Sequence, residues 1–252
     1  MFTLKKCKIS DLLVEKGLAD NEKEALALIM AGKVVAAERR IDKPGTMIAE
    51  GVPIRVKVGS KFVSRAGDKL ESAIKLFALE DEFKNCLAMD VGASTGGFTD
   101  CLLSYGARRV HTVDVGTNQL DWKIRNNPNV EVTEKTDFRK FKYPFETIAE
   151  GQILNWIVAD VSFISLVTLV EAFKENSMKG TRLLLMVKPQ FEIPKDLVPA
   201  GGVVEDEELI QSSVGRVCEE FEKSGFKKLG QALSGVQGKQ GNQEVFLYLE
   251  RI

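Results

Sequence analysis

The sequence is poor in the residues that build metal centres and disulfide frameworks. Its 252 residues include one histidine, His111, and four scattered cysteines with no CxxC pair: Cys7, Cys86, Cys101 and Cys218. Ligands this sparse exclude a zinc cluster, and four cysteines in a chain of this length do not form a disulfide scaffold. We therefore expect no metal site and a reducing, cytoplasmic location.

Long apolar runs are also absent. The longest stretches, residues 164–170 and 183–187, fall far short of the roughly 20 residues that a membrane-spanning helix needs. Residues 1–11 carry three lysines but no apolar core of the length found in signal peptides. We therefore expect no membrane partner.

The chain has almost no net charge, −1 at pH 7, which at first argues against a nucleic-acid partner. The charges are unevenly distributed, however. Residues 1–65 contain 13 Lys and Arg against 8 Asp and Glu, whereas residues 66–252 contain 22 against 28. A basic front and an acidic body are typical of a polyanion-binding module attached to another domain, although uneven surface charge without a binding role would give the same count.

The first sixty residues have the pattern of a small α+β domain. Helices are predicted over residues 11–16 and 21–31, with Asp20 as the N-cap of the second helix. Short strands are predicted at residues 33–35 and 53–58. We assign residues 1–60 to this domain and residues 61–65 to a linker.

After residue 65 the pattern changes to a regular alternation of strands and helices. Strands are predicted at 86–91, 109–115, 130–134, 156–160, 182–187, 227–232 and 244–250, and helices at 97–105, 162–178 and 206–224. This alternation predicts an α/β domain over residues 66–252, with a mostly parallel seven-stranded sheet covered on both faces. Because only a loop joins the last two strands, we expect them to form an antiparallel pair.

The strongest local signal is the glycine-rich segment 90–98, which lies between a predicted strand and a predicted helix. Glycines at such a crossover let the backbone approach a nucleotide, although a tight turn that serves only packing has the same composition. The spacing matches neither a dinucleotide fingerprint nor a P-loop. Asp90 would repel a pyrophosphate but suits the cationic groups of S-adenosylmethionine.

Two further carboxylates follow the next strands. Asp114 is placed to accept the ribose hydroxyls of a nucleotide, and Asp137 to accept its adenine amino group. The carboxyl ends of parallel strands share one edge of the sheet, so these groups are expected to meet the glycine loop there. The predicted cofactor-binding residues are Asp90, Gly92, Ser94, Thr95, Gly96, Gly97, Phe98, Asp114, Val115, Asp137, Phe138 and Asp160.

Asp160 and Lys188 end the fourth and fifth predicted strands. A lysine at the end of a central strand is costly unless it is paired or used in chemistry. The chain lacks the Asn/Asp-Pro-Pro-aromatic loop typical of nitrogen methylation, and it has no cysteine there for attack on a pyrimidine carbon. A lysine–aspartate pair suits methylation of a ribose hydroxyl.

Six ordered motifs resemble the TlyA, or hemolysin A, family; they lie at residues 63–70, 90–99, 159–166, 187–192, 201–204 and 241–244. The resemblance implies a ribosomal-RNA 2′-O-methyltransferase acting on cytidine ribose, with a Rossmann-like, FtsJ-like catalytic domain that uses S-adenosylmethionine. It also implies a catalytic tetrad of Lys69, Asp160, Lys188 and Glu244. In this tetrad Lys188 would activate the 2′-hydroxyl, Asp160 and Glu244 would hold that lysine, and Lys69 would position the substrate or complete the charge network.

The front domain resembles RNA-binding domains of the ribosomal-protein S-four type. It departs from their pattern at residues 8–10, 20–22 and 36–39, where the last departure removes an expected Asn/Asp-Gly turn. The candidate RNA contacts are Lys5, Lys6, Lys8, Lys33, Arg39 and Arg40, together with Arg65. A solvated basic face or a protein-docking module is the alternative.

Two other functions compete with methylation of ribosomal RNA. One is a hemolysin-like, membrane-active protein, and the other is a catalytically silent RNA-binding factor for ribosome assembly. The complete tetrad argues against the silent factor, because a protein that has lost catalytic activity does not require two lysines at these positions. The sequence leaves the oligomeric state open.

Overall fold

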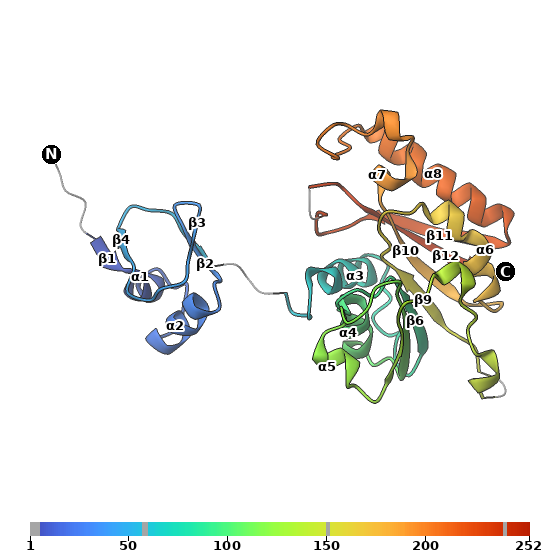
Figure 1. Ribbon diagram of the computed structural model, residues 1–252, viewed down its shortest axis with the longest axis horizontal. Helices are drawn as coiled ribbons and strands as arrows, with labels where there is room; N and C mark the ends of the chain where they lie inside the picture. Colours follow the sequence, from blue (N-terminus) through green and yellow to red (C-terminus); the bar gives the residue numbers. More distant parts are fainter. Residues whose placement is uncertain (1–5, 57–59, 150–151, 239–240) are drawn as a thin grey trace. The chain divides into compact units, whose positions relative to one another are not determined.

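A computed structural model describes residues 6–56, 60–149, 152–238 and 241–252. The chain divides into two compact units, residues 1–59 and 60–252 (Figure 1). Lys5, one of the candidate RNA contacts, lies outside the described residues.

The first unit packs two helices, α1 (Ile9–Glu15) and α2 (Glu22–Met30), against short strands. Strands β1 (Lys6–Lys8) and β4 (Met47–Ala49) form one antiparallel pair, and β2 (Val34–Ala36) lies between β3 (Arg39–Ile41) and β5 (Ile54–Val56) in an antiparallel sheet. A small core of aliphatic side chains joins helices and strands: Ile9, Leu13, Ala25, Ile29, Val34 and Ile41. The strands of three residues are too short to give a periodic signal, so the sequence indicated only two of the five.

One local prediction for this unit was wrong in detail, and one turn forms without the residues that the family pattern has there. The N-cap of α2 is Asn21, whose side chain accepts a hydrogen bond from the backbone N–H of Glu24 at 3.0 Å, and not Asp20. The turn between β2 and β3 forms without Asn or Gly, because Ala37 and Glu38 adopt φ values of 47° and 58°. These left-handed conformations are costly for residues with a Cβ.

The second unit is built on a seven-stranded sheet with the order β11-β12-β10-β9-β6-β7-β8. The strands are β6 (Leu87–Val91), β7 (Arg109–Val113), β8 (Val130–Thr133), β9 (Trp156–Ala159), β10 (Arg182–Val187), β11 (Phe226–Leu233) and β12 (Val245–Arg251). Strands β6 to β10 pair in parallel, and β12 is antiparallel to both β10 and β11. The predicted α/β sheet is confirmed, and its last strand inserts between the fifth and sixth.

Helices cover both faces of this sheet (Figure 1). On one face α3 (Arg65–Leu76) and α4 (Gly97–Ser104) bury a cluster that includes Leu70, Phe98 and Phe246; on the other, α6 (Val170–Glu175) and α8 (Glu207–Lys223) bury Phe173 and Phe221. The remaining short elements are α5 (Trp122–Arg125), α7 (Pro189–Glu192), η1 (Phe138–Lys140), η2 (Phe145–Thr147), η3 (Leu166–Leu169) and η4 (Lys195–Leu197). Every parallel strand therefore ends at one edge, where the loops that carry the sequence motifs meet.

Two boundaries differ from the sequence prediction. The helix expected over residues 162–178 begins only at η3, because Phe163 adopts a φ of 64° and Ser165 caps η3. Residues 61–65, expected to be a linker, pack on the second unit: Phe62 is buried, and the backbone N–H of Val63 donates to Asp100 at 2.9 Å. Arg65 is already the first residue of α3.

Candidate active site

The glycine-rich loop joins β6 to α4 at the carboxyl edge of the sheet. Gly92 has a φ of 79°, and a Cβ there would approach the backbone oxygen of Asp160 to 3.1 Å. The loop is fixed to the end of β7 by Asp114, whose carboxylate accepts from the backbone N–H groups of Ser94 at 2.7 Å and Gly116 at 2.6 Å. The sequence therefore places a carboxylate next to a stretch of backbone that a ligand can approach closely, as a nucleotide site requires.

A cavity of about 680 Å³ opens beside this loop. Of the predicted cofactor-binding residues, seven line it: Gly92, Ser94, Asp114, Val115, Asp137, Phe138 and Asp160. Arg139 hydrogen-bonds to the carboxylate of Asp137 and lowers its pKa to about 2, so this acceptor stays ionised at neutral pH. The cavity thus combines charged acceptors with apolar surface, which suits a nucleoside carrying a cationic tail.

The other predicted loop residues support the cavity without lining it. Gly96 and Gly97 allow close packing, since a Cβ at Gly97 would lie 2.3 Å from the Ser64 hydroxyl. The Phe98 ring is buried and stacks on Phe246. Thr95 is exposed, and its carbonyl accepts from the backbone of Asp121. These four residues shape the loop, so the sequence motif is partly a packing signal.

Asp90 lies behind the loop and is fully buried. One carboxylate oxygen accepts from the Thr99 hydroxyl at 2.6 Å, and the other has no hydrogen-bond partner among the described residues. Burial raises the pKa of Asp90 to about 7, and the nearby Asp160 adds to the rise. A buried carboxylate with an open acceptor is suited to a cationic neighbour.

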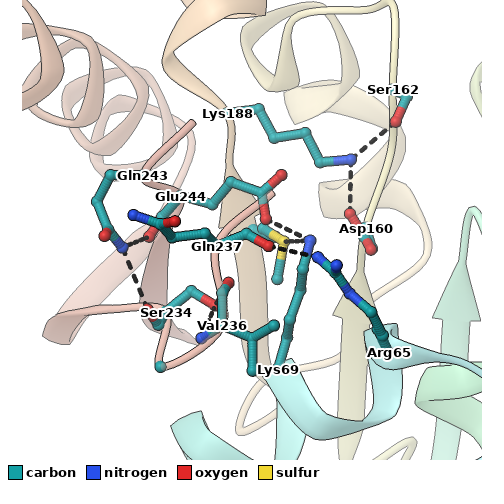
Figure 2. Close-up of polar contacts among 12 residues, drawn as sticks. Arg65, Lys69, Asp160, Ser162, Lys188, Ser234, Val236, Gln237, Gln243 and Glu244 are labelled. Carbon is teal, nitrogen blue, oxygen red and sulfur yellow. Dashed lines mark hydrogen bonds and ion pairs between the residues drawn. The ribbon is translucent and has the colours of Figure 1, made fainter. Parts of the chain in front are cut away.

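The four tetrad residues form two ion pairs, shown in Figure 2. The Lys188 ammonium lies 2.7 Å from Asp160 and donates to the Ser162 hydroxyl at 2.7 Å. Lys69, from α3, lies 2.5 Å from Glu244, which directly precedes β12. Glu244 was expected to hold Lys188; instead its ion pair is with Lys69, because α3 brings that ammonium within reach of the carboxylate.

The two pairs differ in their access to the cavity. Lys188, Asp160 and Glu244 line it, whereas Lys69 does not and contacts the Met186 sulfur at 3.9 Å. Both lysines are 8% exposed. The arrangement therefore presents one ammonium to a ligand and keeps the second beneath it, attached to the carboxylate of Glu244.

Several cavity residues were not singled out from the sequence. They are Gln119, Thr136, Val161, Ser162, Phe163, Ile164, Gln190, Phe191, Gly202, Gly238 and Asn242. Eight of these eleven fall inside the six motifs, so the motifs themselves were the available signal, while Gln119, Thr136 and Gly238 lie outside the motifs. Phe163 stands out because its side chain is 91% exposed and its ring centroid lies 5.3 Å from that of Phe191.

Asn242 connects two of the motifs. Its side chain accepts from the backbone N–H of Val204 at 2.9 Å and donates to the carbonyl of Gly202 at 2.8 Å. The side chain is 1% exposed, so both bonds are shielded from water. This amide holds the 201–204 segment beside the segment that carries Glu244.

The predicted RNA contacts have different surroundings. Arg65 donates to the carbonyl of Gln237 at 2.7 Å and so attaches α3 to the loop between β11 and β12 (Figure 2). In the first unit four of them are exposed and Lys33 is half-buried; the exposed ones are Lys6, Lys8, Arg39 and Arg40. These exposed cations could contact a polyanion without rearrangement of the core.

Two kinds of site are absent from the described part of the chain. No helix there is long and apolar enough to cross a membrane. Within the same residues, no cluster of three or more His, Cys, Asp and Glu side chains could hold a metal ion.

A family model of FtsJ-like methyltransferases matches residues 62–251. The chain belongs to the FtsJ-like methyltransferase family. As an FtsJ-like methyltransferase it uses S-adenosylmethionine, and the cavity fits this donor. Asp114 and Asp137 offer acceptors for hydroxyl and amino groups, and Val115 and Phe138 offer apolar surface for a base. Behind the loop, one oxygen of Asp90 has no hydrogen-bond partner within the described part of the chain.

Two relatives of this FtsJ-like methyltransferase match nearly its whole length. It is 38% identical to "16S/23S rRNA (cytidine-2'-O)-methyltransferase TlyA" of Mycobacterium tuberculosis, over 97% of this chain and 90% of that protein. It is 34% identical to "Hemolysin A" of Brachyspira hyodysenteriae, over 94% of this chain and 97% of that protein. The resemblance to the TlyA and hemolysin A family is therefore confirmed.

Solved structures agree with this assignment. A Streptococcus thermophilus protein, provisionally described as a hemolysin, has a TM-score of 0.73 at 34% identity, covering 99% of this chain and 90% of that one. An S-adenosylmethionine-dependent methyltransferase from Mesorhizobium loti has a TM-score of 0.52 at 13% identity, covering 71% of this chain and 96% of that one. The second likeness shows the shared methyltransferase fold.

Proposed function

We propose that this enzyme transfers the methyl group of S-adenosylmethionine to the ribose 2′-hydroxyl of a cytidine in ribosomal RNA. The observation that carries the proposal is the Lys188 ammonium, which Asp160 and Ser162 hold at the wall of the cofactor cavity. The names of its relatives support the substrate: one is a 16S/23S and another, from Campylobacter jejuni, a 23S rRNA (cytidine-2'-O)-methyltransferase.

Lys188 favours ionisation of the ribose hydroxyl. An ammonium that donates toward the 2′-oxygen stabilises the negative charge that develops there as the proton leaves. Asp160 and Ser162 fix the direction of the ammonium, so little reorganisation is needed during the reaction. S-adenosylmethionine would supply an electrophilic methyl group: as the 2′-oxygen bonds to the methyl carbon, the bond from that carbon to sulfur would break, S-adenosylhomocysteine would leave, and the hydroxyl proton would pass to water.

Lys69 and Glu244 form the second ion pair of the site, next to Lys188. Glu244 lines the cavity and keeps its charge balanced through its contact with Lys69, which is itself buried. A carboxylate here can accept from a ribose hydroxyl while the pair stays neutral as a whole. We therefore assign Lys69 to the support of Glu244 and Lys188 to the reacting oxygen.

The RNA would be bound at two places, by the cations of the first unit and at the cavity of the second. In the first unit, exposed cations such as Arg39 and Arg40 would contact phosphates without reading sequence. At the cavity, the exposed Phe163 ring beside Phe191 offers a stacking surface for an unpaired base. A ribosomal substrate would place the enzyme in the cytoplasm.

Transfer of tritiated methyl groups to unmodified ribosomal subunits, followed by mapping of 2′-O-methyl positions, tests the proposal. We expect label on a cytidine ribose, and none on subunits that already carry the modification. Label on a base would contradict the chemistry. Tight binding of the subunits with no transfer would instead favour the silent assembly factor.

A further inference from the structure

A buried carboxylate lies just outside the tetrad. Glu192, the last residue of α7, is 3% exposed and does not line the cavity. One of its oxygens accepts from the Ser165 hydroxyl at 2.6 Å, and the other accepts from the backbone N–H of Leu166 at 2.7 Å. Both donors belong to the end of the loop that leads from β9 to η3.

This loop carries three groups of the active site: Asp160, Ser162 and Phe163. Among the described residues, its side-chain bonds to the segment 188–192 occur at two points. Lys188 contacts Asp160 and Ser162 at one point, and Glu192 contacts the end of the loop at the other. Residues that begin and end a single turn of helix therefore hold the loop at both ends.

The loop needs such support because its backbone is strained. Phe163 has a φ of 64°, which is unfavourable for a bulky residue and persists only where the surroundings fix it. The Ser165 hydroxyl also accepts from the N–H of Val167 at 3.2 Å and caps η3. Glu192 thus fixes the residue at which the strained loop returns to helical geometry.

The chemistry of the site explains why a carboxylate is used. Two donors converge on Glu192, and an ionised carboxylate can accept a hydrogen bond at each of its two oxygens. Burial raises the pKa of Glu192, a cost that a purely apolar contact would avoid. The Arg216 guanidinium, 4.0 Å away and half exposed, gives only partial compensation.

We infer that Glu192 is a positioning residue for methyl transfer, acting through the loop that presents Ser162 to Lys188 and Phe163 to the substrate. The inference rests on the proposed function, because its effect is measured on the ribosomal RNA reaction. Glu192 touches neither the cavity nor the tetrad lysines, so its removal leaves S-adenosylmethionine binding intact. A displaced loop reduces turnover, since an error of about 1 Å at a reacting group costs on the order of 100-fold.

The test compares Glu192→Ala, Glu192→Gln and Ser165→Ala with the wild type on unmodified ribosomal subunits. Turnover is divided by the number of sites that bind S-adenosylmethionine, measured by calorimetry, so that unfolded protein is not counted. We expect kcat per site to fall about 30-fold in Glu192→Ala and about fivefold in Ser165→Ala. Glu192→Gln keeps one acceptor and should recover to within about threefold of wild type.

Asn176→Ala is the matched control. Asn176 is also fully buried and ties a loop to a helix, through Tyr143 and Ala172, but it lies outside the cavity lining. It should lower the melting temperature without changing kcat per site. Unchanged kcat per site in Glu192→Ala and Ser165→Ala would overturn the inference, whereas a wild type inactive on every subunit would overturn the proposed function instead.

Discussion

In the second unit, Lys69 and Lys188 are each 8% exposed and paired with a carboxylate, whereas Lys8, Arg39 and Arg40 of the first unit are exposed. A buried charge is costly unless its partner is held in place, so the fold must fix both members of each pair. An exposed cation has no such requirement. The proposed catalytic cations therefore depend on the fold, while the cations proposed to contact RNA depend on their number and placement.

The largest effect is expected from Lys188→Ala. It removes the ammonium that we propose faces the reacting oxygen. Methyl transfer should then fall about 1,000-fold, while S-adenosylmethionine binds within about threefold of wild type. Tritium transfer and calorimetry measure the two quantities. Lys188→Arg is the control for charge alone. Full activity of Lys188→Ala would mean that the buried pair is structural and that the distinction between the units is wrong.

Glu244→Ala tests how much stability is lost when the buried Lys69 ammonium has no carboxylate partner. It leaves Lys69 buried beside Met186, and we expect a loss of about 3 kcal/mol in the free energy of unfolding of the second unit. Urea unfolding followed by tryptophan fluorescence measures it.

The double variant Lys69→Met/Glu244→Leu is the control for this cost. It should recover most of the stability, since no charge then remains buried, but not the activity. An active double variant would show that the Lys69–Glu244 pair serves folding only.

How far these features can be predicted from sequence depends on the range of the interaction. The parallel strands, the glycine loop and the motif residues Asp160 and Lys188 follow from local pattern, and the structure brings them to one edge. The partner of Glu244 did not follow, because Lys69 lies 175 residues away in the chain and only packing of α3 places it there. Gln119 enters the cavity through a loop without any periodic or motif signal.

The hairpin between β2 and β3 of the first unit also depends on contacts that are distant in the sequence. The sequence lacks the Asn-Gly turn expected between its strands, yet the hairpin forms with Ala37 and Glu38 in left-handed conformations. Core packing of Val34, Ala36 and Ile41 outweighs the local preference of the turn residues. Local rules thus fail where tertiary contacts provide more free energy than the turn loses.

Asp90 gives a smaller, pH-dependent effect in the second unit. Its pKa rises from 3.8 to about 7 on folding, so between these values the folded chain keeps a proton that the unfolded chain has released. Through this group, stability is present at low pH and is lost as the pH rises toward 7. Unfolding without S-adenosylmethionine at pH 5 and pH 7 should differ by no more than about 2 kcal/mol from this cause. In Asp90→Asn this contribution should be absent; an identical pH dependence in the variant would show that Asp90 is ionised throughout.

The smallest effect is expected from three cations of the first unit, the half-buried Lys33 and the exposed Arg39 and Arg40. Replacing Lys33, Arg39 and Arg40 by glutamine should weaken RNA binding about tenfold at moderate salt, because each phosphate contact releases condensed counterions. The slope of log K against log salt should decrease by about 0.7 to 0.9 for each cation that contacts a phosphate. Filter binding across a salt series measures both quantities.

A control triple variant separates contact from net charge. Lys84 and Lys223 of the second unit are exposed and Lys174 is partly buried, and each is paired with a nearby carboxylate of its own segment. Replacing the three by glutamine changes the net charge equally. If both triple variants reduced the salt slope alike, the first unit would act only through its charge. A change confined to the Lys33, Arg39 and Arg40 variant, with kcat at saturating RNA unchanged, would mean that the cations of the first unit hold the substrate and the buried pairs carry out the chemistry.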